Sequence, residues 1–148
     1  MIYASAPDSP SGVDIGERLT SLIFIIHFKE KSMRQWMCNP KFMCNNHLFG
    51  EHVEHHMFIG TLIKKKSING YIINDLLEPL SLQARHDDLA DEMLKRKFKH
   101  NTPLEFENSI FNYLSKDQID HKINKLNSLV LLLSRCPMCQ QYYYRNVE

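Results

Sequence analysis

The sequence predicts an all-α fold, a compact single-domain bundle of three to four helices preceded by a disordered N-terminal extension. Apolar residues recur at helical spacing in two stretches of the second half of the chain. Two capping boxes and a proline suited to the first helical turn mark where helices begin. We expect no sheet of note.

Composition fits one soluble globular domain, because 43% of the 148 residues are hydrophobic and 24% are charged. No run approaches the roughly 20 apolar residues of a membrane span, so we expect no membrane association. The formal net charge is only +1. A nucleic-acid partner must therefore be argued from local basic patches.

The first 32 residues differ from the rest. Residues 1–20 are rich in Ser, Pro, Gly and Asp without periodicity, which indicates disorder. The short apolar run of residues 21–28 lacks the basic region of a signal peptide. Residues 29–32 can be encoded by a purine-rich stretch resembling a ribosome-binding site. We expect residues 1–32 to be a leader upstream of the true start at Met33; a genuine extension is the alternative. Residues 33–148 are the predicted domain.

A helix is expected from about Met43 to Lys65, after Pro40. If Gly50 is helical, one face carries a polar stripe of three residues, and another face carries the apolar residues expected to be buried. The polar stripe is His47, Glu51 and Glu54; the apolar set is Phe49, Val53, Met57 and Ile63. Lys64, Lys65 and Lys66 would then follow at the C-terminal end, where cations are favoured.

The later elements follow from local signals. Asn69-Gly70 indicates a turn, and Pro79 suits the first position of a helix that runs to about Lys97. The buried stripe of that helix is Leu82, His86, Leu89 and Met93. Thr102–Glu105 is a capping box that predicts a short helix to about Tyr113. Ser115–Gln118 is a second one, before the stripe Ile119, Ile123, Leu126, Val130 and Leu133.

The four cysteines, Cys38, Cys44, Cys136 and Cys139, are expected to be thiols in a reducing compartment. Cys136 and Cys139 form a C-x-x-C pair, which is half of a zinc site. Cys38 and Cys44 could complete it only if the chain ends meet. We predict buried unpaired cysteines rather than a metal, which leaves Cys136 and Cys139 as the weaker metal hypothesis.

Four histidines, His47, His52, His55 and His56, fall within ten residues. His52 and His56 are spaced to chelate zinc with a third ligand, but no HExxH motif is present. A polar helix face is the favoured interpretation, and a metal-dependent nuclease is one alternative. We predict no cofactor.

Basic and aromatic residues gather in patches suited to phosphate contact and base stacking. The patches are Lys64–Lys66, Lys95–Lys97 with Lys99, and Tyr142–Arg145. Solvated helix ends explain any single patch equally well. A further candidate is the amine of Met33, if the working chain begins there. An α-amino group has a pKa of about 7.7–8.0, so part of it is nucleophilic at neutral pH.

Several segments together resemble the pyrimidine dimer DNA glycosylase family, whose type member is a phage endonuclease V. The segments are MRQWMCNPKFMC, HLFGEHVEHHMF, RHDDLADEMLKRKF and the late CPMC. The resemblance implies an endonuclease V-like helical fold and no metal. It also implies a glycosylase/AP lyase that attacks the sugar C1′ at pyrimidine dimers in ultraviolet-damaged double-stranded DNA, forms a Schiff base and continues by β-elimination.

Carried over by position, the resemblance places the nucleophilic amine on Met33 and the catalytic glutamate on Glu54. It assigns Arg34 and His47 to DNA contact. The type enzyme has arginines where this chain has Val53 and Met57. Either other residues bind DNA here, or the chain has lost dimer-specific binding. The candidates for DNA binding are Lys41, His55, Lys64, Lys65 and Lys66.

We therefore expect a monomeric DNA-repair enzyme in the cytoplasm, associated with the nucleoid of a bacterial or phage-infected cell. The rival hypothesis is a non-catalytic helical module that binds nucleic acid or protein, stapled by zinc through Cys136 and Cys139. Dependence on a free amine at Met33 would distinguish them.

Overall fold

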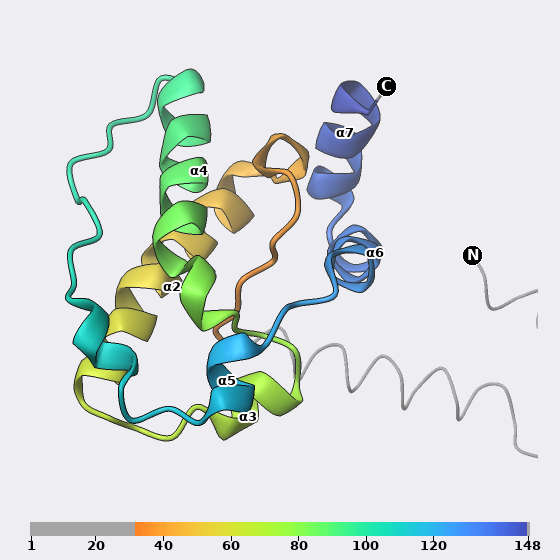
Figure 1. Cartoon of the computed structure of the whole chain (residues 1–148). Helices are drawn as coiled ribbons and strands as arrows, with labels where there is room; N and C mark the ends of the chain where they lie inside the picture. Colours follow the sequence, from red (N-terminus) through yellow and green to blue (C-terminus); the bar gives the residue numbers. More distant parts are fainter. Residues whose placement is uncertain (1–31, 148) are drawn as a thin grey trace, which may run out of the picture. The chain divides into compact units, whose positions relative to one another are not determined.

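The computed structural model describes residues 32–147 (Figure 1). By its internal contacts the chain divides into two units, Met1–Met33 and Arg34–Glu148, and the second is described here by itself. The predictions for residues 1–31 lie outside the described residues. Within residues 32–147, no helix combines the length and apolar character that a membrane crossing requires.

The described residues form helices and no strand, as predicted. Four helices have ten residues or more, which confirms the expected bundle. They are α2 (Asn45–Ile63), α4 (Leu82–Lys95), α6 (Lys125–Arg135) and α7 (Pro137–Asn146). Shorter pieces join them: α3 (Asn69–Ile73), α5 (Lys116–Asp120), and the 3-10 turns η2 (Pro40–Phe42), η3 (Pro79–Ser81) and η4 (Asn108–Phe111).

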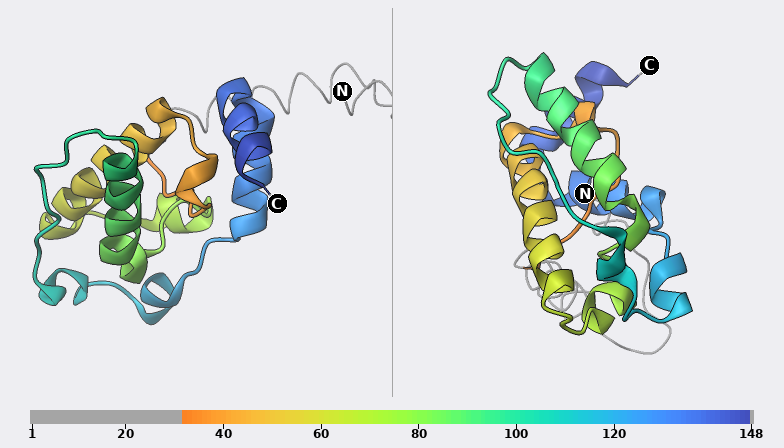
Figure 2. Two further views of the ribbon diagram at one scale, coloured as in Figure 1. Left: turned by 90° about the horizontal axis from the view of Figure 1, so that it is seen from above. Right: turned by 60° about the vertical axis from the view of Figure 1, so that its left-hand side comes forward.

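The helices are arranged in two pairs. α2 packs against α4, and α7 packs against α6 and η2. Figure 2 shows the segment that leads into α2 running between these two pairs. The main apolar cluster lies around this segment and is formed by Trp36, Cys38, Met43, Cys44, Leu48, Leu89, Met93, Leu132 and Cys139.

Helix α2 lies within the predicted range and includes Gly50, but the predicted buried face is wrong. Val53, Met57 and Ile63 are all more than half exposed. The buried residues are Leu48, Glu51, His52, His55, Phe58, Ile59 and Leu62. Three of these are polar and find partners inside the protein. Apolar residues lie on both the buried and the exposed side of this helix, so they do not identify the buried side by themselves.

Two other local predictions fail around α4. The turn expected at Asn69-Gly70 is the start of helix α3, which is fixed by the buried Ile68 and by Tyr71 packing on Phe58. The second failure is the helix predicted from Thr102, which is absent. The helix start predicted at Pro79 is confirmed, because Pro79 begins η3, which continues into α4, and all four residues of the predicted stripe are buried.

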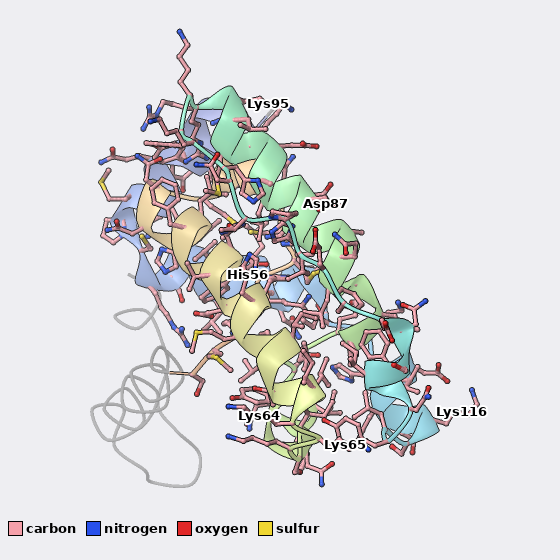
Figure 3. The ribbon with its side chains drawn as sticks, turned by 90° about the vertical axis from the view of Figure 1, so that its left-hand side faces the viewer. His56, Lys64, Lys65, Asp87, Lys95 and Lys116 are labelled. Carbon is pink, nitrogen blue, oxygen red and sulfur yellow. The ribbon has the colours of Figure 1, made fainter. Side chains whose placement is uncertain are left out.

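Residues 98–107 are instead irregular and return the chain along α4 toward η4, which contacts α2 (Figure 3). An extended residue advances about 3.3 Å, against about 1.5 Å in a helix. A helix over residues 98–107 would be too short to bring the chain from the end of α4 back to η4. Leu104 is buried and anchors the segment.

The capping box at Ser115 is confirmed, but the long helix predicted after it is interrupted. Helix α5 ends at Asp120, and α6 begins at Lys125 behind its own cap, Asn124. Two carboxylates hold the interruption open. Glu78 accepts the backbone N–H of Ile123 at 3.0 Å, and Asp75 accepts that of Asn124 at 3.0 Å. Of the predicted stripe, Leu126 and Val130 are exposed as a result.

Helix α4 ends with Lys97 in the left-handed conformation, at φ 66°. Its N–H donates to Leu94 O, and the next N–H, of Phe98, donates to Met93 O. This is the arrangement in which glycine is favoured, because a side chain with a Cβ is strained there.

We expect Lys97→Gly to raise the free energy of unfolding by about 1 kcal/mol, because it removes this strain. The matched control is Lys95→Gly, at the last residue of α4, which should lower it by up to about 1 kcal/mol because glycine disfavours the helical conformation. Denaturant unfolding of both variants measures the two values. If both variants changed the free energy of unfolding in the same direction, the explanation based on backbone strain at Lys97 would be wrong.

Candidate functional site

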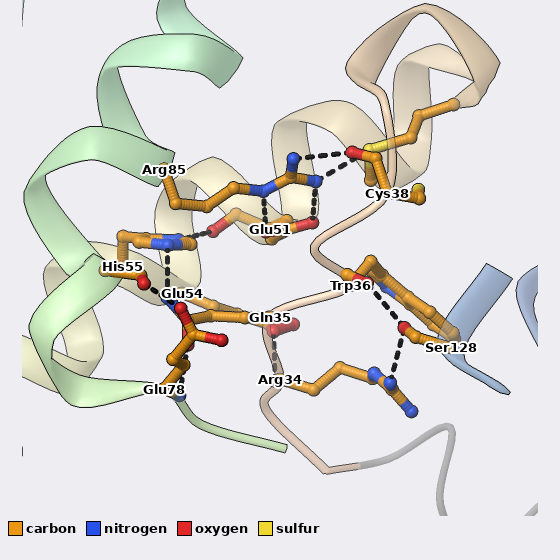
Figure 4. Close-up of polar contacts among 12 residues, drawn as sticks. Arg34, Gln35, Trp36, Cys38, Glu51, Glu54, His55, Glu78, Arg85 and Ser128 are labelled. Atoms are coloured by element: carbon orange, nitrogen blue, oxygen red, sulfur yellow. Dashed lines mark hydrogen bonds and ion pairs between the residues drawn. The ribbon is translucent and has the colours of Figure 1, made fainter. Parts of the chain in front are cut away.

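The residues directly after Met33 are threaded through the interior without forming a regular element. Arg34, Gln35 and Trp36 are buried, at 4%, 0% and 6% exposure. A segment without regular secondary structure in the core must have its backbone polar groups paired, since an unpaired group is costly. Trp36 O accepts from Ser128 Oγ at 2.5 Å, and Cys38 O accepts from Arg85 Nη1 at 2.5 Å (Figure 4).

Gln35 attaches this segment to three other residues through hydrogen bonds. Its backbone N–H donates to Leu76 O at 2.8 Å, and its side-chain Oε1 accepts from the N–H of Glu78 at 2.5 Å. Its Nε2 lies 3.1 Å from His55 Nε2. His55 Nδ1 lies 2.8 Å from Glu51 O, so both ring nitrogens are engaged, and burial lowers the pKa of His55. The ring is therefore neutral, with Nδ1 as donor and Nε2 as acceptor.

A buried ion pair fixes α4 against α2. Arg85 Nε lies 2.6 Å from Glu51 Oε2, and Arg85 Nη2 lies 2.8 Å from Glu51 Oε1. The side chains are 4% and 0% exposed. Arg85 also donates a hydrogen bond to Cys38 O. One guanidinium therefore joins both helices to residues 34–38, which we call the threaded segment.

Glu54 is hydrogen-bonded to the beginning of this segment. Its Oε2 accepts the backbone N–H of Arg34 at 2.9 Å. Burial raises the pKa of Glu54 to about 7, although the hydrogen bond from Arg34 acts in the opposite direction. Glu54 is therefore placed beside the peptide bond that joins Met33 to Arg34, and it can exchange a proton near neutral pH.

The residues predicted to contact DNA fall into two groups. Arg34 and His55 lie inside the protein. The Arg34 guanidinium donates to Ser128 Oγ at 2.9 Å and stacks 3.8 Å above the Trp36 ring. Lys41 and Lys64–Lys66 are exposed and flank α2 at its two ends. Figure 3 shows Lys64 and Lys65 at the end of α2 far from Lys95.

The histidines of α2 do not form the polar surface that was predicted. In α2, His52 and His55 are 5% and 0% exposed. His86 of α4 is 1% exposed, and His52 Nε2 lies 2.8 Å from His100 Nε2. The ligand atoms of these three residues lie within 4.8 Å of one another. Burial, followed by the neighbouring histidines His86 and His100, lowers the pKa of His52 to about 4. Sequence reasoning paired His52 with His56 and missed the two partners that come from distant elements.

His47 faces a different environment, at the N-terminal end of α2. Its Nδ1 lies 3.3 Å from Cys44 Sγ and 3.5 Å from Cys139 Sγ. Cys44 Sγ is 3.8 Å from Cys136 Sγ. Sequence reasoning paired Cys44 with Cys38. The available signal was the Cys44-x2-His47 spacing, which matches that of Cys136 and Cys139.

The comparison with protein families decides the identity. The model of the pyrimidine dimer DNA glycosylase family matches residues 33–106. The chain belongs to this family. The match includes the threaded segment, α2 with Glu54, and α4, and it ends before α5. No curated protein and no solved structure matched the chain. Membership gives this glycosylase-family chain a role in DNA repair, with DNA as its substrate.

The buried ion pair yields a stability prediction. We expect Arg85→Met to lower the free energy of unfolding by about 3–5 kcal/mol, because it leaves the Glu51 carboxylate buried without its partner. Combining it with Glu51→Gln should recover part of that loss, since the orphaned charge is then removed.

Chemical denaturation measures both effects. Lys116→Met is the control, because it breaks the exposed Lys116–Asp120 pair and should change stability little. A cost for Arg85→Met as small as that of the control would show that the buried pair does not hold α4 in place.

Proposed function

We propose that this chain is a DNA glycosylase/AP lyase for pyrimidine dimers in ultraviolet-damaged DNA, with the amine of Met33 as nucleophile. The single observation that carries the proposal is the 2.9 Å hydrogen bond from Arg34 N to the half-buried Glu54. It ties the catalytic carboxylate expected from the family to the residue that follows the expected nucleophile.

Covalent geometry limits how far the two groups can be separated. Consecutive backbone nitrogens cannot lie more than about 3.6 Å apart, since that is the full reach of one residue. Added to the 2.9 Å between Arg34 N and Glu54 Oε2, this keeps the Met33 nitrogen within about 6.5 Å of the carboxylate. A sugar C1′ bonded to that nitrogen would therefore lie next to Glu54.

The chemistry assigns a role to each group. In the free-base form the amine attacks C1′ and the glycosidic bond to the base breaks. The C1′–O4′ bond then opens as an amine proton passes to O4′, and the Glu54 carboxylate stabilises the resulting cationic imine. Glu54 next accepts a C2′ proton while the 3′ phosphate leaves in the β-elimination, and it returns that proton to solvent. A pKa of about 7 suits a group that must both take and give a proton near neutral pH.

The proposal requires a working chain that begins at Met33, with residues 1–32 as leader. An amide nitrogen at Met33 would have no nucleophilic lone pair, because it is conjugated with the preceding carbonyl. The family match also begins at residue 33, which supports this assignment.

DNA would be held by the exposed lysines at the two ends of α2. With 19 residues, the helix is about 28 Å long, close to one turn of duplex DNA. Lys41 lies before its start and Lys64–Lys66 after its end. Val53 and Met57, exposed on either side of Glu54 in the sequence, would present apolar contacts to the opened nucleotide.

Borohydride trapping tests the nucleophile directly. We expect a covalent adduct with an abasic-site duplex and with ultraviolet-irradiated DNA from the form that begins at Met33, and none from the 148-residue form. The imine can form only on a free amine, and borohydride reduces it to a stable bond. Adducts from neither form, with folded protein, would favour the rival DNA-binding module. Equal adducts from both would place the nucleophile elsewhere.

Glu54→Gln tests the carboxylate. We expect the trapping and cleavage rates to fall by about 10²–10⁴-fold, with DNA affinity nearly unchanged. In the unsubstituted protein, the rate should fall as pH drops through about 7, because both Glu54 and the amine become protonated. Glu105→Gln removes the same charge from an exposed position and is the matched control.

Glu54→Gln should also change how the free energy of unfolding depends on pH. The folded-state pKa of Glu54 is raised, so the folded protein binds a proton that the unfolded chain releases between about pH 4.5 and 7. The contribution of Glu54 to the free energy of unfolding therefore decreases as pH rises through this window. Glu54→Gln should remove that slope. An unchanged slope would show that Glu54 is not the buried carboxyl described here.

A further inference from the structure

We propose that Cys44, His47, Cys136 and Cys139 form a structural zinc site that ties the C-terminal helix α7 to the start of α2. One ligand atom of each residue lies within 4.8 Å of all the others. Cys44 and Cys139 are buried, and His47 and Cys136 are half-buried. The family match ends at residue 106, so two of the four ligands lie outside it.

The distances fit a tetrahedral metal rather than a disulfide. Zinc–sulfur bonds of about 2.3 Å and zinc–nitrogen bonds of about 2.0–2.1 Å place two sulfurs about 3.8 Å apart, and a sulfur and a nitrogen about 3.6 Å apart. The measured separation of Cys44 Sγ from Cys136 Sγ is 3.8 Å. His47 Nδ1 lies 3.3 and 3.5 Å from the sulfurs of Cys44 and Cys139. A disulfide would require about 2.05 Å between sulfurs.

Both halves of the site have the same local form. Cys44-x2-His47 and Cys136-x2-Cys139 each place the first ligand at the N-cap of a helix, α2 and α7 respectively. Backbone N–H groups point at the sulfurs: Cys44 N donates to Cys139 Sγ at 3.3 Å, and Cys139 N donates to Cys136 Sγ at 3.4 Å. Such N–H groups at a helix start stabilise thiolates, which are the ligand form of cysteine.

The surroundings indicate a structural role. Four protein ligands leave no open position for water or substrate, and a three-cysteine, one-histidine set is typical of structural zinc. Trp36 packs its ring against His47, with centroids 5.7 Å apart, and Leu48 and Leu132 belong to the same apolar cluster. The site is also about 10 Å from Glu54 along α2. His47 is thereby a ligand in place of the DNA contact that the resemblance assigned to it.

The metal would join parts of the chain that are 92 residues apart. The other attachments of α7 to this region are side-chain contacts, including Phe42 against Tyr143 and Arg96 over Tyr142. On binding, three thiols release their protons to solvent and the neutral imidazole supplies Nδ1, so affinity falls at acid pH. The metal would thus fix together residues whose proximity cannot be predicted from helical periodicity in the sequence.

Metal analysis of the full 148-residue chain, purified under reducing conditions, tests the proposal. We expect one zinc per chain, lost with a chelator together with a fall in Tm of about 10 °C or more, and restored by zinc ions. Replacing zinc with cobalt should give tetrahedral absorption and a strong thiolate charge-transfer band. The cobalt measurement needs no variant, so it also decides the matter if a cysteine variant does not fold.

Variants locate the site. Cys139→Ser should lose the metal, whereas His47→Cys should keep it, because a fourth thiolate replaces the imidazole. Cys38→Ser is the matched control: Cys38 is equally buried but outside the cluster, and zinc should be retained. Absence of zinc and of the cobalt thiolate band would overturn the proposal. So would metal that survives Cys139→Ser but is lost in His100→Gln, which would place it at the histidine group.

Discussion

The structure depends on burying an irregular segment, residues 34–38, between two pairs of helices. Such a segment has no ladder of its own, so its backbone groups must be paired by groups from elsewhere. Glu54, Arg85 and Ser128 supply side chains from α2, α4 and α6, and Leu76 supplies a carbonyl. This requirement explains why the inner face of α2 is polar at positions where a bundle helix would usually be apolar.

The same constraint places the functional groups. Because Gln35 is fixed on three sides, the chain immediately before it cannot move far from Glu54. Burial raises the pKa of this carboxyl to about 7, although the N–H of Arg34, in the threaded segment, lowers it. A nucleophile at the start of a segment fixed in this way would need little further ordering before reaction.

Along α2 the structure separates three tasks. The N-terminal end carries His47 and faces the cysteines, the middle carries Glu51 and Glu54, and exposed lysines follow the C-terminal end. In the proposed account, the metal and the chemistry occupy separate parts of one rigid helix, and the lysines proposed to bind DNA flank its two ends. Such a helix holds sites in a more constant relation than loops do.

Features that depend on neighbours along the chain could be predicted from the sequence. The capping box at Ser115, the start at Pro79 and the stripe of α4 were all read correctly, since each depends on spacing within a few residues. Family membership was also carried by local segments, and the comparison confirmed it.

The tertiary structure decided what depends on distant partners. The break before α6 is held by Asp75 and Glu78, and the buried side of α2 is set by Arg85 and Gln35. His47 meets cysteines that lie some ninety positions further along the chain. A buried polar group is stable only beside its partner, and helical periodicity carries no information about where that partner is.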